Sequence, residues 1–228
     1  GDKRISPVYD HKDKRRLRKI IMGGTDLVKY LADQMTFGIN PVYVTGTYSE
    51  EELAASIREA SWQNQMILEE STPGFAYEYW DVNKWGERVY KININYEIPN
   101  PEERKRLQIE MLDKAEKIID SVGLYTNGHH VEELYGINNY LIDNGSYSTE
   151  VAEKKIVNTM QRKAYGILVE GRGVCSSYAR AFQLVSRAAG FICVVDTGTV
   201  VDSEREQGLH AWNLVCTDVN GYGYRKWM

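Results

Sequence analysis

The stretch Glu170–Gly190, EGRGVCSSYARAFQLVSRAAG, decides how the rest of the chain is interpreted. It predicts a short loop with two glycines that leads into a helix beginning at Cys175. Gly190 stands where a left-handed residue would end that helix. Apolar residues recur at steps of three and four, the spacing of a helix with one buried face: Tyr178, Ala179, Phe182, Val185 and Ala189. The stretch therefore predicts a thiol in the first turn of a packed helix.

A thiol in that position has two chemical consequences. The first N–H groups of a helix have no partner within the helix, and the helix dipole is positive at this end. Both effects favour the thiolate, which is the nucleophilic form of cysteine, and the same N–H groups can hold an oxyanion. Gly171 and Gly173 carry no Cβ and would let the backbone approach a substrate closely. The same pattern also fits a small buried residue at the start of a core helix.

A general base for Cys175 is found at His210, in the segment Leu209–Thr217, LHAWNLVCT. Read as a strand, this segment places His210 and Trp212 on one face and Asn213 on the other. The preceding segment Phe191–Val201 is rich in β-branched residues and also predicts strand, and Glu204–Gly208 predicts a loop. A helix packed on an antiparallel sheet can bring the two ends together, as Cys–His catalysis requires.

The remaining histidines and cysteines offer weaker candidates. His129 and His130 are adjacent, so they cannot share one helix face, and we interpret them as loop residues. Cys193 and Cys216 lie on candidate neighbouring strands. They could form one disulfide, and the alternative is that both are free thiols. The paired close spacing of structural zinc sites is missing, so we expect no metal.

Two blocks of this sequence resemble the signature segments of the transglutaminase-like superfamily. They are the run Gly173–Ala179, GVCSSYA, and the run His210–Asn213, HAWN, and they cover less than half of the chain. The resemblance implies a papain-like α+β fold in which Cys175 is the nucleophile and His210 its general base. Backbone N–H groups around Val174 and Cys175 are the expected oxyanion donors, and Trp212, on the same strand face as His210, would either form a substrate wall or pack in the core. No cofactor is expected.

The same resemblance implies an Asp, one strand further on, that orients the histidine. Here the following strand is predicted to begin near Tyr224, and the sequence ends at Met228. Asp218 comes too early and stands close to a turn-forming dipeptide, Asn220-Gly221. We therefore expect the orienting Asp beyond Met228, in a catalytic core whose C-terminus is truncated in this sequence.

The first half of the chain predicts two further segments. Residues 1–48 form a polar N-terminal arm with a basic cluster and a short helix around Leu27–Met35. Residues 49–122 form a helix–hairpin–helix α/β unit: Ser49 and Glu52 have the spacing of a capping box, and two alternating segments predict a hairpin. Residues 123–228 form the transglutaminase-like core, with helices at Val131–Ile142 and Ser148–Tyr165 before the Cys175 loop. The predicted class is α+β, with helices packed on an antiparallel sheet.

Composition excludes several classes of function. The chain has 228 residues, 43% hydrophobic and 26% charged, which fits a globular protein with a real core. Its formal net charge is −4, so no nucleic-acid surface is indicated. No apolar run approaches the roughly 18 residues that a transmembrane helix needs.

The predicted function is acyl transfer through a thioester on Cys175, with peptide or carboxamide hydrolysis favoured. Attack on the thioester by an amine in place of water would give a cross-linking transglutaminase. A third alternative is a non-catalytic interaction module that keeps the fold, because fold alone does not establish function. The expected partner is a protein or peptide substrate, and the oligomeric state is open. The resemblance implies a bacterial protein located outside the cytoplasm or at the cell surface.

Overall fold

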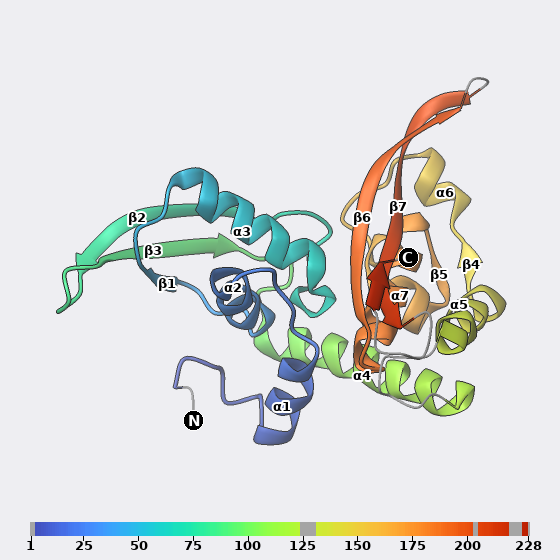
Figure 1. Cartoon of the computed structure of the whole chain (residues 1–228), viewed down its shortest axis with the longest axis horizontal. Coiled ribbons are helices and arrows are strands. Elements are labelled where there is room, and N and C mark those ends of the chain that lie inside the picture. Colours follow the sequence, from blue (N-terminus) through green and yellow to red (C-terminus); the bar gives the residue numbers. More distant parts are fainter. Residues whose placement is uncertain (1–2, 124–130, 203–204, 219–224, 228) are drawn as a thin grey trace. The chain divides into compact units, whose positions relative to one another are not determined.

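The structure is a computed structural model that describes residues 3–123, 131–202, 205–218 and 225–227 (Figure 1). The chain divides into two compact units, residues 1–106 and residues 107–228. The division falls within a single long helix, α4 (Pro101–Val122). Each unit is described below by itself.

The first unit is built on a three-stranded antiparallel sheet of order β1-β3-β2. Its helices are short and begin at side-chain caps: Ser49 and Glu52 form the predicted capping box at the start of α3. The alternation of the third strand places Tyr90, Ile92 and Ile94 in the core, as predicted. The elements of this unit are α1 (His11–Lys19), α2 (Asp26–Thr36), β1 (Val42–Thr45), α3 (Glu50–Gln63), η1 (Gln65–Ile67), β2 (Gly74–Val82), β3 (Arg88–Asn95) and the first turn of α4.

The second unit combines helices with a three-stranded antiparallel sheet of order β6-β7-β8 and a two-stranded parallel ladder, β4-β5. Helix α7 lies against β6 and β7, and α5 packs against α7. The elements are the remainder of α4, α5 (Val131–Asn144), β4 (Ser146–Tyr147), α6 (Thr149–Glu153), η2 (Met160–Arg162), the π-helical turn η3 (Gly166–Glu170), β5 (Arg172–Gly173), α7 (Cys175–Ala188), β6 (Ile192–Asp202), β7 (Arg205–Asp218) and β8 (Arg225–Trp227).

Helix α7 begins and ends where the sequence predicts. Gly190 has φ +95°, and Phe191 N donates to Ser186 O while Gly190 N donates to Arg187 O, the bond pattern of a Schellman cap. The helix is buried on more than the one predicted face, since Arg180, Gln183 and Ser186 are also buried. Such burial on several faces follows from packing between a sheet and a second helix.

Two predicted segments differ from the structure. The helix predicted over Ser148–Tyr165 ends at Glu153, because Lys155 and Asn158 take positive φ values of 49° and 56°. The loop predicted over Glu204–Gly208 is in part strand: Arg205 pairs with Asp202, and Gly208 pairs with Val200. The first difference follows from the backbone conformation at Lys155 and Asn158, and the second follows from the pairing of β6 with β7, which continues as far as Asp202 and Arg205.

The mixed helix-and-sheet class predicted from the sequence is confirmed. The predicted domain limits at 48/49 and 122/123 stay a prediction. The structure adds that β1, which lies before residue 48, pairs with β3 in the same sheet. Within the described residues, no helix combines the length and the apolar character that crossing a membrane requires.

Candidate functional site

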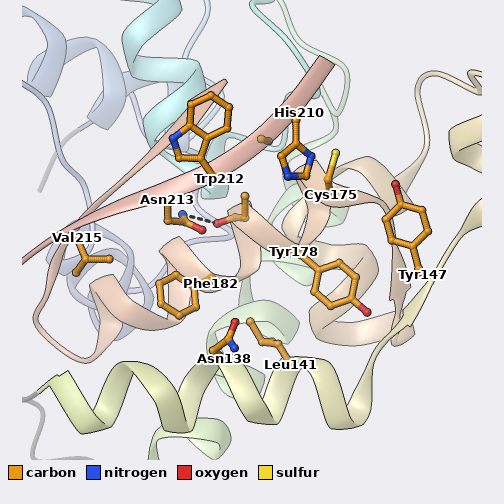
Figure 2. A pocket seen from close by; sticks show the side chains of 12 residues that line it. Asn138, Leu141, Tyr147, Cys175, Tyr178, Phe182, His210, Trp212, Asn213 and Val215 are labelled. Carbon is orange, nitrogen blue, oxygen red and sulfur yellow. Dashed lines mark hydrogen bonds between the residues drawn. The ribbon is translucent and has the colours of Figure 1, made fainter. Parts of the chain in front are cut away.

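One pocket in the second unit brings together the two residues selected from the sequence. It has a volume of about 510 Å³ and is lined by Cys175 and His210. Figure 2 shows the thiol and the imidazole on the same side of the pocket, turned toward each other. The other lining side chains include Tyr147, Tyr178, Phe182, Trp212 and Asn213.

Cys175 is the first residue of α7, and it is half-buried. Val174 is the N-cap, with extended backbone (φ −99°, ψ −178°) and no side-chain cap. The N–H of Val174 donates to Gln161 O at 3.0 Å, so this group is committed to the fold. The oxyanion donors available next to the thiol therefore begin at the N–H of Cys175 itself.

The two glycines before Cys175 have different surroundings, and the space beside Gly173 is filled by the protein itself. A Cβ on Gly173 would lie 2.4 Å from Ser177 Oγ, so the side chain of Ser177 fills that space. Ser177 Oγ donates to Lys163 O at 2.6 Å and accepts from Ile167 N at 3.1 Å. Gly171 ends η3 in the left-handed region at φ +68°. The close substrate approach expected at these glycines is therefore wrong for Gly173.

His210 and Trp212 lie on the outer face of β7. Their ring centroids are 6.4 Å apart with an interplanar angle of 33°. His210 is exposed, and Trp212 is 38% exposed. Gly198 pairs with His210 across the sheet, and a Cβ there would lie 2.6 Å from Trp212 Cη2. The indole of Trp212 thus occupies the space that a side chain at position 198 would take, and it lies beside the imidazole of His210.

Asn213 lies on the inner face of β7 and fastens the strand to the helix. Its Nδ2 donates to Ala179 O at 2.9 Å and to Val194 O at 3.3 Å (Figure 2). This bond joins β7 to the first turns of α7, the two elements that carry His210 and Cys175. Asn213 therefore holds backbone, as its predicted strand face implied.

Tyr147 is a pocket residue that sequence reasoning missed. Its ring lines the pocket beside Cys175. Burial, followed by the negative form of the Cys175 thiol, raises the pKa of Tyr147. The backbone of Cys175 and then the positive charge of Arg162 act in the opposite direction and lower the pKa of Tyr147. Its only sequence signal is an aromatic residue after the Asn144-Gly145 break.

The other cysteines do not form a disulfide, and all three thiols are free. Cys193 pairs with Val215 and Cys216 pairs with Ile192, so the two side chains point to opposite faces of the sheet. Cys193 is fully buried, and burial raises its pKa to about 12. In the described part of the chain, no group of three or more His, Cys, Asp and Glu could hold a metal ion.

No carboxylate lines the pocket among the described residues. The orienting Asp, which the sequence analysis expects beyond Met228, stays a prediction. His129 and His130 lie outside the described residues, and so do the side chains of Asp218 and Trp227.

Comparison with known proteins finds a family model that covers the residues of the pocket. Residues 121–228 match the family model described as the transglutaminase-like superfamily, which confirms the resemblance drawn from the sequence. A solved structure described as "Crystal structure of a TGase" is 15% identical, with a TM-score of 0.40 over 68% of this chain. This chain spans 43% of the length of that one. The comparison with curated proteins found no match.

Proposed function

Residues 121–228 carry a transglutaminase-like core, and from this premise we propose that the chain is a cysteine acyl-transfer enzyme that hydrolyses peptide or carboxamide bonds. One observation carries the proposal: Cys175 at the start of α7 and His210 on β7 line the same pocket of about 510 Å³. A nucleophile and a base on separate elements that converge in one cavity are the minimum set for thiol catalysis.

The proposed reaction has two halves. His210 takes the proton of the Cys175 thiol, and the sulfur attacks the substrate carbonyl to give a tetrahedral oxyanion. The intermediate collapses, the C–N bond breaks, and the leaving amine takes the proton from His210. Water then attacks the thioester while His210 accepts its proton. The C–S bond breaks, a carboxylic acid leaves, and the thiol is restored.

The exposure of His210 lets water reach the thioester, which supports hydrolysis as the second half of the reaction. The imidazole is exposed, and its neighbour Trp212 is 38% exposed. Solvent therefore reaches the edge of the pocket where the thioester would form. Trp212 provides a flat apolar wall for the acyl group.

The packing of α7 on β6 and β7 supports a papain-like arrangement for this core. In such an arrangement a carboxylate would orient His210. Asn213 does not take that role, because its amide is engaged with Ala179 and Val194. We propose that a carboxylate that orients His210 is the third member of the site.

The pairing of Cys175 with His210 is tested by alkylation with iodoacetamide from pH 5 to pH 9, mapped to each cysteine by mass spectrometry. We expect Cys175 to be labelled faster than Cys193 and Cys216, because its sulfur lies at the pocket beside the imidazole of His210, which can take the thiol proton. His210→Ala should slow this labelling by about tenfold or more. His11→Ala, a change in α1, is the matched control and should leave the rate unchanged.

Equal labelling rates in native protein and His210→Ala would contradict the pair. The reaction type is then resolved with an N-blocked glutaminyl peptide, with and without a fluorescent primary amine. Release of ammonia without amine incorporation supports hydrolysis. Incorporation of the amine would show cross-linking activity instead. Absence of any acyl-enzyme on Cys175 would favour the non-catalytic module.

A further inference from the structure

The first unit has a pocket of its own, with a volume of about 350 Å³. This volume lies within the range of about 300–1,000 Å³ that is typical of small-molecule sites. The charged residues that line it are two arginines, Arg4 and Arg104, and none of the described residues that line it is acidic. Apolar side chains form much of the wall: Phe37, Ile39, Pro41, Pro99 and Pro101. The pocket therefore combines an apolar wall with positive charge.

Arg104 is fully buried, and the protein holds two of the three nitrogens of its guanidinium. Nε donates to Ile98 O at 3.0 Å, and Nη1 donates to Met35 O at 3.3 Å and to Ile67 O at 2.7 Å. The ring of Tyr96 lies beside the group, with its centroid 4.8 Å from Arg104 Cζ. These contacts fix the position of the guanidinium, because it cannot turn without breaking them.

The third nitrogen of Arg104, Nη2, is buried and has no hydrogen-bond acceptor among the described residues. The acceptors that Arg104 does bind are neutral carbonyls. Burial lowers the pKa of Arg104, because the charged form is removed from water. Glu69 acts on this charge more weakly than Tyr96 and Tyr9, and its Oε1 accepts from Glu97 N at 3.0 Å. A buried cation with a donor to spare is stabilised when an anion meets that donor.

Several other polar groups along the pocket are engaged by the fold. Asn40 Nδ2 donates to Ile94 O at 2.9 Å, and Asn40 Oδ1 accepts from Ile94 N at 3.0 Å. Gly38 N donates to Met35 O at 3.0 Å. Gly38 has φ +64°, and a Cβ there would lie 2.9 Å from Arg104 Nε, so only glycine lets the backbone lie this close to the guanidinium. Of these groups, Arg104 Nη2 is the donor left for a ligand.

We propose that this pocket binds a carboxylate with an apolar body, one carboxylate oxygen accepting a hydrogen bond from Arg104 Nη2 and the apolar body packing on Phe37 and Pro41. Guanidinium is the side-chain group best suited to carboxylates, and the bond is stronger when water is excluded. Arg4 adds a second positive charge to the same pocket. A free organic acid and the C-terminus of a peptide share this chemistry. The site belongs to the first unit and does not depend on the chemistry proposed for Cys175.

Titration calorimetry on the full chain tests the site with phenylacetate and with its neutral counterpart phenylacetamide. We expect saturable binding of phenylacetate with a Kd on the order of 1 mM or tighter, and binding of the amide weaker by about tenfold or more. The dipeptide N-acetyl-alanyl-phenylalanine, as its acid and as its C-terminal amide, forms the second pair. Tighter binding of the peptide acid than of phenylacetate would identify a peptide C-terminus as the ligand, and the reverse order a free acid. Either order supports the site.

Ser6→Trp places the binding in this pocket without removing a bond of Arg104. Ser6 is half-buried and lines the pocket, so an indole there would fill it. We expect phenylacetate to bind this variant at least about tenfold more weakly. Ser71→Trp is the matched control, since Ser71 is exposed in the same unit and does not line the pocket, and it should bind as native protein does.

Three results would overturn the carboxylate site. They are native-like binding by Ser6→Trp, equal binding of each acid and its amide, and no saturable heat from either acid up to about 20 mM. Each of them leaves the proposed function standing, because that function is measured separately by the labelling of Cys175. Loss of His210-dependent labelling together with intact phenylacetate binding would overturn the proposed function and support this site.

Discussion

At the scale of single residues, the three cysteines have three different environments. Cys175 lies half-buried at a pocket, Cys216 is partly buried on the outer face of β7, and Cys193 is enclosed between sheet and helix. The thiol of Cys193 is 3.7 Å from Asn213 Nδ2. This hydrogen bond lowers its pKa less than burial raises it. We expect Cys193 to stay unlabelled at pH values where Cys175 reacts.

The buried thiol also predicts a pH dependence of stability. The folded pKa of Cys193 is about 12, above the ordinary thiol value, so folding favours the protonated form. Its contribution is fully present below about pH 8.5 and is lost as the pH rises toward 12, because the unfolded chain releases the proton first.

Urea unfolding at pH 8 and pH 10 measures the effect. We expect native protein to lose about 2 kcal/mol more than Cys193→Ala over this interval. Comparing each protein with itself cancels the cavity that the substitution leaves. Identical losses in the two proteins would contradict the assignment.

At the scale of elements, the attachment of β7 to α7 decides whether the pocket stays assembled. Asn213 makes the side-chain bond between them, to Ala179 O. Asn213→Ala should lower the free energy of unfolding by about 1–3 kcal/mol, because two carbonyls lose a donor. It should also slow acylation of Cys175, since His210 is three residues away on the same strand. Thermal unfolding and acylation measured together check this, and a variant with native stability would contradict it.

Local signals predicted the elements that depend on local contacts. The capping box at Ser49, the alternation through β3 and the glycine end of α7 are all readable from neighbouring residues. Cys175 and His210 were found in the same way, because each stands at the beginning of a regular pattern.

The elements that depend on distant partners were missed. The chain after α6 leaves the helical path, and Arg162 binds back to Ile156 O and Val151 O through its side chain. On α5, the buried residues are Glu133, Ile137 and Leu141, so an acidic side chain shares the buried face with two apolar ones. Tyr147 is brought close to Cys175 by the β4-β5 ladder. Each strand of this ladder has only two residues, which is too short to give a recognisable sequence pattern.

At the scale of the whole molecule, the chain consists of two compact units that each have their own core. In the first unit, Arg104 is fully buried and binds three carbonyls: Nε donates to Ile98 O at 3.0 Å, and Nη1 donates to Met35 O at 3.3 Å and to Ile67 O at 2.7 Å. Its guanidinium lies 4.8 Å from the Tyr96 ring centroid.

Arg104→Leu should therefore destabilise the first unit by about 3 kcal/mol or more, since three buried carbonyls lose their donor. We expect hydrogen exchange to accelerate in residues 1–106, while amides of α7 and alkylation of Cys175 stay native-like. Arg58→Leu, a change on α3, is the control. Equal acceleration in both units would show that they unfold together.

The β4-β5 ladder also closes the intervening segment, residues 148–171, into a loop whose two ends lie side by side. Its two ends are tied together beside the pocket, and Gln161 O binds Val174 N on the return path. The turn at Lys155–Asn158 lies away from these ties and is exposed. Extra residues inserted there, or a single protease cut, would leave the phenol and the thiol in the same frame. This turn is thus the place where the core can accept a tag, a reporter or an evolutionary insertion without losing its chemistry.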